Sequence, residues 1–284
     1  MAINKCALVL EGGGLRGAYT AGALTWFIDN NIEFDYSYGI STGAIYLCNY
    51  LMKSKENLLY FSTDGIADKR YMYLPAILRS GKIVDYDYLF NHIMEEENHY
   101  DLSPLKDCKS NAYYGLYDLQ LGKTVYYPIQ EININLLKAS TTLPILGKIV
   151  KENGRELFDG GITDMIPIEK AIEDGCNKFV VIATKPQTYR RKPSKKFIVN
   201  LMRRTYSKYP KLYQDYEIRH INYEKQINLI KSLCDKKQAI YCCPSKESKV
   251  TRLDGSKEEL KNLFDMGYQD MEDRKQELLS IIND

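Results

Sequence analysis

Short apolar runs alternate with segments of helical periodicity along the first part of the chain. Residues 5–10 form an apolar run that predicts a strand buried on both faces, and residues 34–40 predict a second strand. Residues 18–30 carry apolar side chains at helical spacing, and a further helix is predicted over residues 42–52. This order of strand, helix, strand and helix predicts a parallel sheet with helices packed on it.

The rest of the chain continues as a mixture of strands and helices. Residues 53–104 are polar with short helical patterns, and residues 111–128 predict a hairpin that turns at Gly122. Other apolar runs predict strands over 155–158, 178–183 and 239–242, and helices are predicted from Pro167 to Gly175, from 194 to 233 and from 257 to 282.

These elements predict an α/β fold with a helical C-terminal part. We expect a three-layer sandwich whose central sheet is mainly parallel and is flanked by helices. Residues 5–185 would form the core, and residues 186–284 a mainly helical part packed on that core. No internal repeat or flexible linker interrupts the pattern.

Composition is that of a globular protein, with 44% hydrophobic and 27% charged residues among 284. The net charge of +2 is too small to indicate a nucleic-acid partner, and none is expected. No apolar run approaches the roughly 18 residues that span a bilayer, and the first ten residues lack the pattern of a signal peptide. The seven cysteines include no CxxC pair, which favours reduced thiols and a cytoplasmic location. None of the three histidines lies near a cysteine in the sequence, so no metal site is predicted; they are His92, His99 and His220.

A glycine-rich loop follows the first predicted strand. The segment Gly-Gly-Gly-Leu-Arg-Gly begins at Gly12 and leads into the predicted helix. Glycines let the backbone approach a ligand, and the helix start directs unpaired N–H groups to the same place. The loop would therefore bind a negative group, either a dinucleotide pyrophosphate or an oxyanion formed in acyl transfer. Gly12, Gly14 and Gly17 fit G-x-G-x-x-G, and Asp35 falls near the ribose-binding position of that motif.

A second loop has the nucleophile-elbow pattern G-x-S-x-G. Gly39, Ser41 and Gly43 lie between a predicted strand and a predicted helix, which is the context that the motif requires. The glycines leave room for a strained turn that projects the serine Oγ into a cleft. The alternative is a serine N-cap between glycine turns. The strand context favours a nucleophile, and it places Asp35 in the strand that delivers Ser41, which disfavours dinucleotide binding.

The best candidate for the base is a carboxylate, because the three histidines lie in polar contexts without a glycine frame. Asp159 ends a predicted strand, and Gly160 and Gly161 open space around it. A carboxylate that is hydrogen-bonded to a serine hydroxyl can act as a base in a water-poor site, where its pKa rises. The alternative is an Asx-turn at the end of a strand.

Together, these loops resemble the signature of the patatin-like phospholipases. The resemblance rests on Gly-Gly-Gly-Leu-Arg-Gly at 12–17, Gly-Ile-Ser-Thr-Gly at 39–43 and Asp-Gly-Gly at 159–161. Ala-Ser-Thr-Thr-Leu-Pro at 139–144 also resembles a segment of that family, and the likeness spans about residues 5–185. Within that family, the sequence most resembles a bacterial-type member.

The resemblance implies a three-layer α/β fold, a Ser–Asp dyad and hydrolysis of the acyl esters of lipids. It makes Ser41 the nucleophile and Asp159 its base, and the N–H groups of the glycine loop would form the oxyanion hole: Gly12, Gly13 and Gly14. Such a mechanism needs no metal and no cofactor. The resemblance also implies supporting roles in the motifs for Arg16, Gly17, Gly39, Gly43, Gly160 and Gly161.

We therefore expect a serine acyl hydrolase that cleaves phospholipids or lysophospholipids through an acyl-enzyme intermediate. One alternative is a small-molecule carboxylesterase that uses the same site. An alternative from another class is a nucleotide-binding module that uses the glycine loop.

A basic stretch suggests where the protein would meet lipid. Residues 185–211 contain ten Lys or Arg and no Asp or Glu, with aromatic and aliphatic side chains between them. Such a stretch suits an anionic membrane surface, and peripheral contact with the inner face of the membrane is expected. The alternative is a solvated helix face whose apolar side packs on the core.

Overall fold

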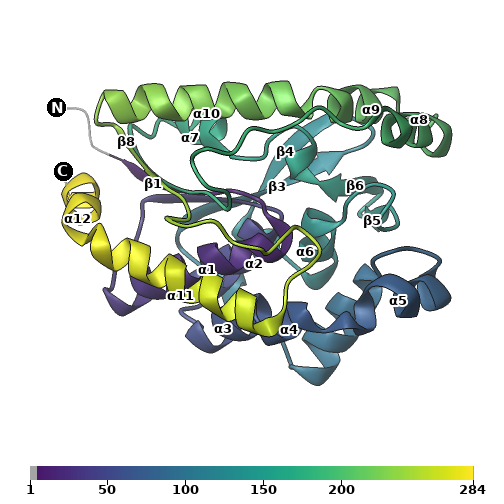
Figure 1. Cartoon of the computed structure of the whole chain (residues 1–284), viewed down its shortest axis with the longest axis horizontal. Coiled ribbons are helices and arrows are strands. Elements are labelled where there is room, and N and C mark those ends of the chain that lie inside the picture. The colour runs from purple at the N-terminus through teal and green to yellow at the C-terminus, as the bar shows by residue number, and fades with distance from the viewer. Residues whose placement is uncertain (1–4, 284) are drawn as a thin grey trace.

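The computed structural model describes residues 5–283. Residues 1–4 and Asp284 lie outside the described residues. They belong to the N-terminal segment for which no signal peptide is predicted and to the end of the predicted C-terminal part. Among the described residues, the strands form one eight-stranded sheet in the order β5-β6-β3-β2-β1-β7-β8, and β4 pairs with β3 (Figure 1). The strands are β1 (Cys6–Leu10), β2 (Tyr36–Ile40), β3 (Asn111–Asp118), β4 (Lys123–Pro128), β5 (Val150–Glu152), β6 (Arg155–Asp159), β7 (Lys178–Ile182) and β8 (Ala239–Cys242).

Parallel pairing joins β3, β2, β1, β7 and β8, whereas β4 and β6 run antiparallel to β3. The helices are α1 (Ala18–Asp29), α2 (Thr42–Leu51), α3 (Lys55–Ser62), α4 (Asp64–Ala67), α5 (Tyr73–Ser80), α6 (Ile134–Thr141), α7 (Ile168–Glu173), α8 (Lys196–Thr205), α9 (Pro210–Glu217), α10 (Arg219–Asp235), α11 (Lys257–Asp273) and α12 (Lys275–Asn283). A 3-10 helix, η1 (Gly14–Gly17), precedes α1, and a π-helical segment, η3 (Tyr88–Glu97), follows α5.

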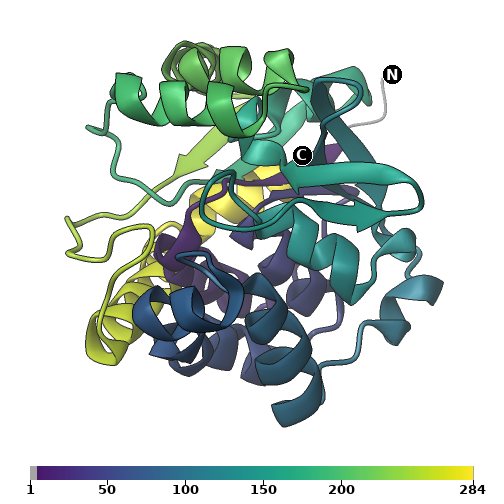
Figure 2. The same ribbon diagram turned by 90° about the vertical axis from the view of Figure 1, so that its right-hand side faces the viewer.

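Helices cover both faces of the sheet, so the molecule has three layers (Figures 1 and 2). Side chains of β1 alternate between two cores: Leu8 and Leu10 pack in the core with α1, α2 and α11, and Ala7 and Val9 pack in the core with α7 and α10. This alternation explains why the strand reads as a continuous apolar run. The predicted α/β class, with a mainly parallel sheet and a helical C-terminal part, is confirmed.

The C-terminal part is joined closely to the sheet and its helices. β8 extends the sheet beside β7, and α11 crosses α1 at very short range. A Cβ at Gly22 would lie 1.9 Å from the carbonyl oxygen of Phe264, and one at Gly267 would lie 2.0 Å from that of Tyr19. Only glycine allows the two backbones to approach this closely. The division at residue 185 stays a prediction.

Element boundaries differ from the sequence prediction mainly where helices break. The segment predicted as helical over 194–233 is three helices. Pro210 begins α9 and lacks the N–H that a continuous helix would use, which accounts for the break between α8 and α9, and a second break lies at Ile218 between α9 and α10. The predicted final helix is two, α11 and α12, which meet at Arg274. The short strand β5 was not predicted, because its three residues alternate too briefly to form a pattern. Within residues 5–283, no helix is long and apolar enough to cross a bilayer.

Candidate active site

The two strands that carry the candidate dyad meet end to end along one edge of β3. β2 runs parallel to β3, and its last residue, Ile40, pairs with Gly115. β6 runs antiparallel to β3 from the opposite direction, and its last residue, Asp159, pairs with Leu116. Because Gly115 and Leu116 are adjacent, Ser41, which follows Ile40, is brought to Asp159 by strand register alone.

Ser41 occupies a strained turn between β2 and α2. Its backbone has φ 57° and ψ −128°, a left-handed φ that is costly for a residue with a Cβ. The turn is tight: a Cβ at Gly39 would lie 2.7 Å from the carbonyl oxygen of Gly43. The Ser41 side chain makes no capping hydrogen bond to α2, so the alternative of a plain serine N-cap does not describe this residue. Its position at the helix N-terminus suits a nucleophile, because the helix dipole stabilises negative charge there.

Asp159 is buried and faces Ser41. Its side chain is 3% exposed, and its Oδ1 accepts a hydrogen bond of 2.7 Å from the N–H of Gly161. Burial raises the pKa of the Asp159 carboxyl, and hydrogen bonds from the Ser41 hydroxyl and the Gly161 N–H, together with nearby Arg219 and Arg252, oppose that rise. The hydrogen bond from the Gly161 N–H to Asp159 forms the Asx-turn that was the alternative interpretation of this residue. Asp159 makes this turn and also accepts a hydrogen bond from the Ser41 hydroxyl.

The glycine loop lies against the serine. A Cβ at Gly12 would lie 2.9 Å from the Cβ of Ser41, so the loop backbone lies in contact with Ser41. The N–H of Gly12 donates to the carbonyl oxygen of Met165 at 3.2 Å. The N–H of Gly13 reaches Thr42 Oγ1 at 3.3 Å, and Gly14 begins η1, where an N–H has no acceptor within the helix. The loop therefore presents Gly13 and Gly14 more freely than Gly12.

The supporting motif positions surround this centre. A Cβ at Gly17 would lie 2.9 Å from Thr42 Oγ1, and one at Gly160 would lie 2.6 Å from the carbonyl oxygen of Gly115 on β3. Arg16 is placed differently, because it does not line the cavity that contains Ser41. Its Nε is buried without a hydrogen-bond partner, and burial, together with Arg252, lowers its pKa.

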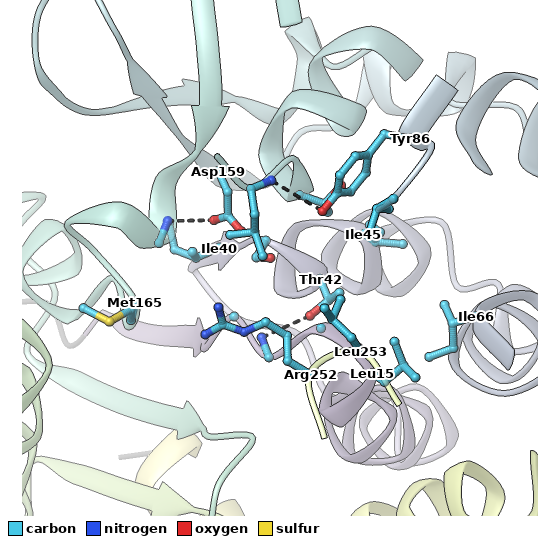
Figure 3. Close-up of a pocket in the computed structure, with 18 of the residues that line it drawn as sticks. Leu15, Ile40, Thr42, Ile45, Ile66, Tyr86, Asp159, Met165, Arg252 and Leu253 are labelled. Atoms are coloured by element: carbon cyan, nitrogen blue, oxygen red, sulfur yellow. Dashed lines mark hydrogen bonds between the residues drawn. The ribbon is translucent and has the colours of Figure 1, made fainter. Parts of the chain in front are cut away.

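An apolar cavity of about 90 Å³ opens at Ser41 and Asp159. Ile45, Ile66 and Leu253 gather on one side of it, whereas the guanidinium of Arg252 points away from them (Figure 3). The other apolar lining residues include Leu15, Ile40, Tyr71, Met72, Val84, Tyr86, Leu89, Leu143 and Met165. Such a lining suits the hydrocarbon chain of a ligand that lies beside Ser41.

No histidine in residues 5–283 lines this cavity. His92 lies on an exposed surface, where Nδ1 contacts the carboxylate of Glu96 at 2.5 Å. The described part of the chain also holds no group of three or more His, Cys, Asp or Glu side chains arranged to bind a metal ion.

Two features of the site carry no signal in the local sequence. The first is an ion pair between Glu11, which follows β1, and Lys185, which lies just after β7; both side chains are buried. Glu11 also accepts hydrogen bonds from the N–H and hydroxyl of Thr184, at 2.6 and 2.9 Å. This pair ties the glycine loop to the neighbouring strand. It also removes Lys185 from the surface of the basic stretch.

The second feature is a cluster of arginines on the cavity wall, formed by Arg191, Arg219 and Arg252. They come from the loop before α8, the start of α10 and the loop before α11. Sequence reasoning placed Arg191 in a membrane-facing stretch and did not single out the other two.

Comparison with known proteins gives matches to both parts of the chain. Residues 8–107 match the family model described as patatin-like phospholipase, and residues 209–283 match one described as a domain of unknown function (DUF6363). The uncharacterized protein YjjU of Escherichia coli (strain K12) is 28% identical over 193 residues, which cover 64% of this chain and 53% of YjjU. The chain thus spans about half the length of that relative.

Among solved structures, VipD from Legionella pneumophila aligns with a TM-score of 0.47 and 14% identity, over 99% of this chain and 68% of VipD. The match to the patatin-like phospholipase model at residues 8–107 contains both the glycine loop and the serine elbow, and it confirms the resemblance of this part of the chain to that family.

Proposed function

We propose that this protein is a serine acyl hydrolase that cleaves the fatty-acyl esters of phospholipids or lysophospholipids. The observation that carries the proposal is Ser41, held in a strained elbow against the buried carboxylate of Asp159 at the wall of an apolar cavity. The family match supports a lipid acyl hydrolase in general. The dyad and the substrate are our inference from the site.

In the proposed mechanism, Asp159 accepts the proton of the Ser41 hydroxyl while Oγ attacks the ester carbonyl. The raised pKa of Asp159 makes it a better proton acceptor than an ordinary carboxylate, although it must still be ionised to act. The alcohol or lysolipid leaves, with a proton returned from Asp159. Water activated by the same carboxylate then attacks the acyl-enzyme and releases the fatty acid.

The oxyanion would be held by backbone N–H groups of the glycine loop. Gly12, Gly13 and Gly14 were the expected donors, and the hydrogen bond from Gly12 to Met165 narrows the proposal to Gly13 and Gly14. The contact of Gly13 with Thr42 Oγ1 is long at 3.3 Å, so a charged oxygen could replace it.

The alternatives fit the site less well. A small-molecule carboxylesterase would use the same dyad, but it would not need so extensive an apolar lining. A nucleotide-binding module would need Asp35 near the glycine loop. Asp35 instead precedes β2 and accepts a hydrogen bond of 2.8 Å from the N–H of Cys6, at the opposite end of β1.

We also propose peripheral contact with an anionic membrane through two exposed surfaces. Eight of the ten basic residues of the stretch 185–211 are exposed, and Phe197 on α8 is 66% exposed among them. On α5, Leu74 and Leu78 are 65% and 79% exposed, close to the cavity-lining residue Met72. Figures 1 and 2 place α8 and α5 at the same end of the molecule. Basic and apolar side chains together favour an interfacial location.

A fluorophosphonate probe and a lipid panel test the proposed reaction. The wild-type protein should be labelled at Ser41 and release fatty acid from phospholipids or lysophospholipids. Ser41→Ala should lose both labelling and hydrolysis while keeping its unfolding transition. Labelling that persists in Ser41→Ala, or a wild type that cleaves only small water-soluble esters, would overturn the proposal.

Sedimentation with vesicles tests the membrane contact separately. Binding to anionic vesicles should fall steeply as salt rises, because exposed charges are screened beyond a Debye length. The triple variant Lys192→Gln, Lys195→Gln and Lys196→Gln should bind less than a control with the same charge change on exposed positions of α10 and its end: Lys225→Gln, Lys231→Gln and Lys236→Gln. Equal sedimentation of the two variants would show that the basic stretch is only a solvated surface.

A further inference from the structure

Three guanidinium groups line the same cavity as the candidate dyad. Arg191, Arg219 and Arg252 all contribute to its wall, and all three also line a neighbouring basic pocket near Tyr189 and Lys192. These three arginines therefore lie at the boundary between the apolar cavity and the neighbouring basic pocket. Asp159 is the only acidic side chain among the described residues that line either pocket.

The arginines lack the partners that buried cations usually have. Within residues 5–283, no carboxylate lies within 4 Å of any of the three. Arg219 is 3% exposed and uses one Nη2 hydrogen bond of 2.5 Å to the carbonyl oxygen of Gly161, but its Nε is buried without a partner. Arg191 and Arg219 contact the rings of Tyr223 and Tyr216, which supply no full negative charge.

Clustering these cations is costly in the absence of an anion. Burial and the charges of the neighbouring arginines lower the pKa of Arg191, and they lower that of Arg219 to about 9. Asp159 attracts Arg219 without a direct ion pair, and it is one carboxylate beside three guanidinium groups. Buried cations are normally paired, so this excess of positive charge points to a negative ligand.

Two arginines of the cluster contact the loops that carry Asp159 and the glycine-rich segment. Arg219 binds the carbonyl of Gly161, the same residue whose N–H holds Asp159. Arg252 lies over the glycine loop: a Cβ at Gly14 would lie 2.7 Å from its Cγ, and its carbonyl accepts from the N–H of Leu15 at 3.1 Å. The guanidinium of Arg252 extends into the cavity below Asp159 (Figure 3). An anion held by these arginines would therefore lie in the same cavity as Ser41.

We propose that Arg191, Arg219 and Arg252 form a phosphate-binding subsite, which makes the protein select acyl esters that carry a phosphate group close to the scissile bond. The proposal rests on the proposed acyl hydrolase function. A phosphate offers several oxygens to several guanidinium forks at once, whereas a neutral glyceride offers none, so the subsite would discriminate between the two.

Binding of inorganic phosphate tests the subsite without requiring catalysis. Calorimetry on Ser41→Ala should detect phosphate binding that is weakened roughly tenfold to a hundredfold when Arg191→Gln or Arg252→Gln is added, since hydrogen bonds to charged groups have that strength. These two are preferred to Arg219, which is buried and supports Gly161. Lys225→Gln is the control, because Lys225 is an exposed cation on α10 that lies outside both pockets and outside the basic stretch 185–211. Phosphate binding that is unchanged in both test variants would overturn the subsite.

A pair of soluble substrates distinguishes a substrate phosphate from free phosphate. We would compare kcat/KM for a short-chain acylglycerol phosphate with that for the same acylglycerol without phosphate. The wild type and Lys225→Gln should prefer the phosphorylated ester, and Arg191→Gln or Arg252→Gln should lose roughly tenfold of that preference. If phosphate binds but the two esters are cleaved equally, the site recognises free phosphate and the proposal on selectivity is wrong. If neither ester is cleaved while phosphate binding still depends on the arginines, the hydrolase proposal fails and the subsite stands.

Discussion

Replacing Lys185 by Met would leave the carboxylate of Glu11 buried without its cation. Glu11 is 0% exposed, and the N–H and hydroxyl of Thr184 would be its remaining donors. In the wild type, Lys185 and Thr184 lower the pKa of Glu11 against the effect of burial, and burial lowers the pKa of Lys185 to about 8. Both groups are therefore charged at pH 7.

The cost of this change has an upper limit set by protonation. Without Lys185, the least costly state of the buried Glu11 carboxyl is the protonated one. The ordinary pKa of this carboxyl is 4.5, so pH 7 lies about 2.5 units above it. At about 1.4 kcal/mol per unit, keeping the carboxyl protonated costs roughly 3.4 kcal/mol. Measured losses on breaking buried pairs, roughly 3–5 kcal/mol, agree with this. We expect Lys185→Met to lower the free energy of unfolding by about 3 kcal/mol at pH 7.

Urea unfolding at several pH values would test this. In Lys185→Met, Glu11 has a folded pKa above its unfolded value, so the neutral group is most favourable below pH 4.5 and becomes unfavourable as pH rises. The difference from wild type should therefore shrink by about 1.4 kcal/mol for each pH unit below 7. Lys231→Met, on an exposed position of α10, should change the free energy by no more than about 0.5 kcal/mol at any pH. A Lys185→Met loss below about 1 kcal/mol, or one that does not vary with pH, would refute the role of the buried pair.

Three more outcomes are expected. Asp159→Asn should lose roughly 10²–10⁴-fold in kcat, whereas replacing the three histidines one at a time should leave most activity; a histidine variant as inactive as Asp159→Asn would instead indicate a triad. Arg252 favours the ionised form of Asp159, so Arg252→Gln should raise the pKa of that carboxyl and move the acid limb of the pH–kcat/KM profile to higher pH. An acid limb that does not move would show that Arg252 does not influence the ionisation of Asp159. Gly39→Ala should prevent formation of the elbow, since its Cβ would lie 2.7 Å from the Gly43 carbonyl, so soluble and active Gly39→Ala would contradict the tight turn.

Local sequence is enough for the strands and loops that carry the chemistry. The predicted strands before Gly12, Ser41 and Asp159 agree with β1, β2 and β6 to within two residues. Each strand is a short run of residues whose side chains become mostly buried, and the glycines next to it allow the turn of the backbone that follows. Helix ends were less well predicted, because the break between α11 and α12 at Arg274 has no proline or glycine to mark it.

Tertiary structure alone decided which side chains meet. Strand register sets β2 and β6 end to end along β3, so that Ser41 faces Asp159, and no local pattern states that pairing. The Glu11–Lys185 pair and the arginine cluster likewise join residues from strands and loops far apart in the chain. Arg191 and Lys185 looked like members of a surface stretch because charge runs are usually solvated. Whether Arg191 and Lys185 are buried depends on the elements that pack against them, and the arrangement of those elements is set by the whole fold.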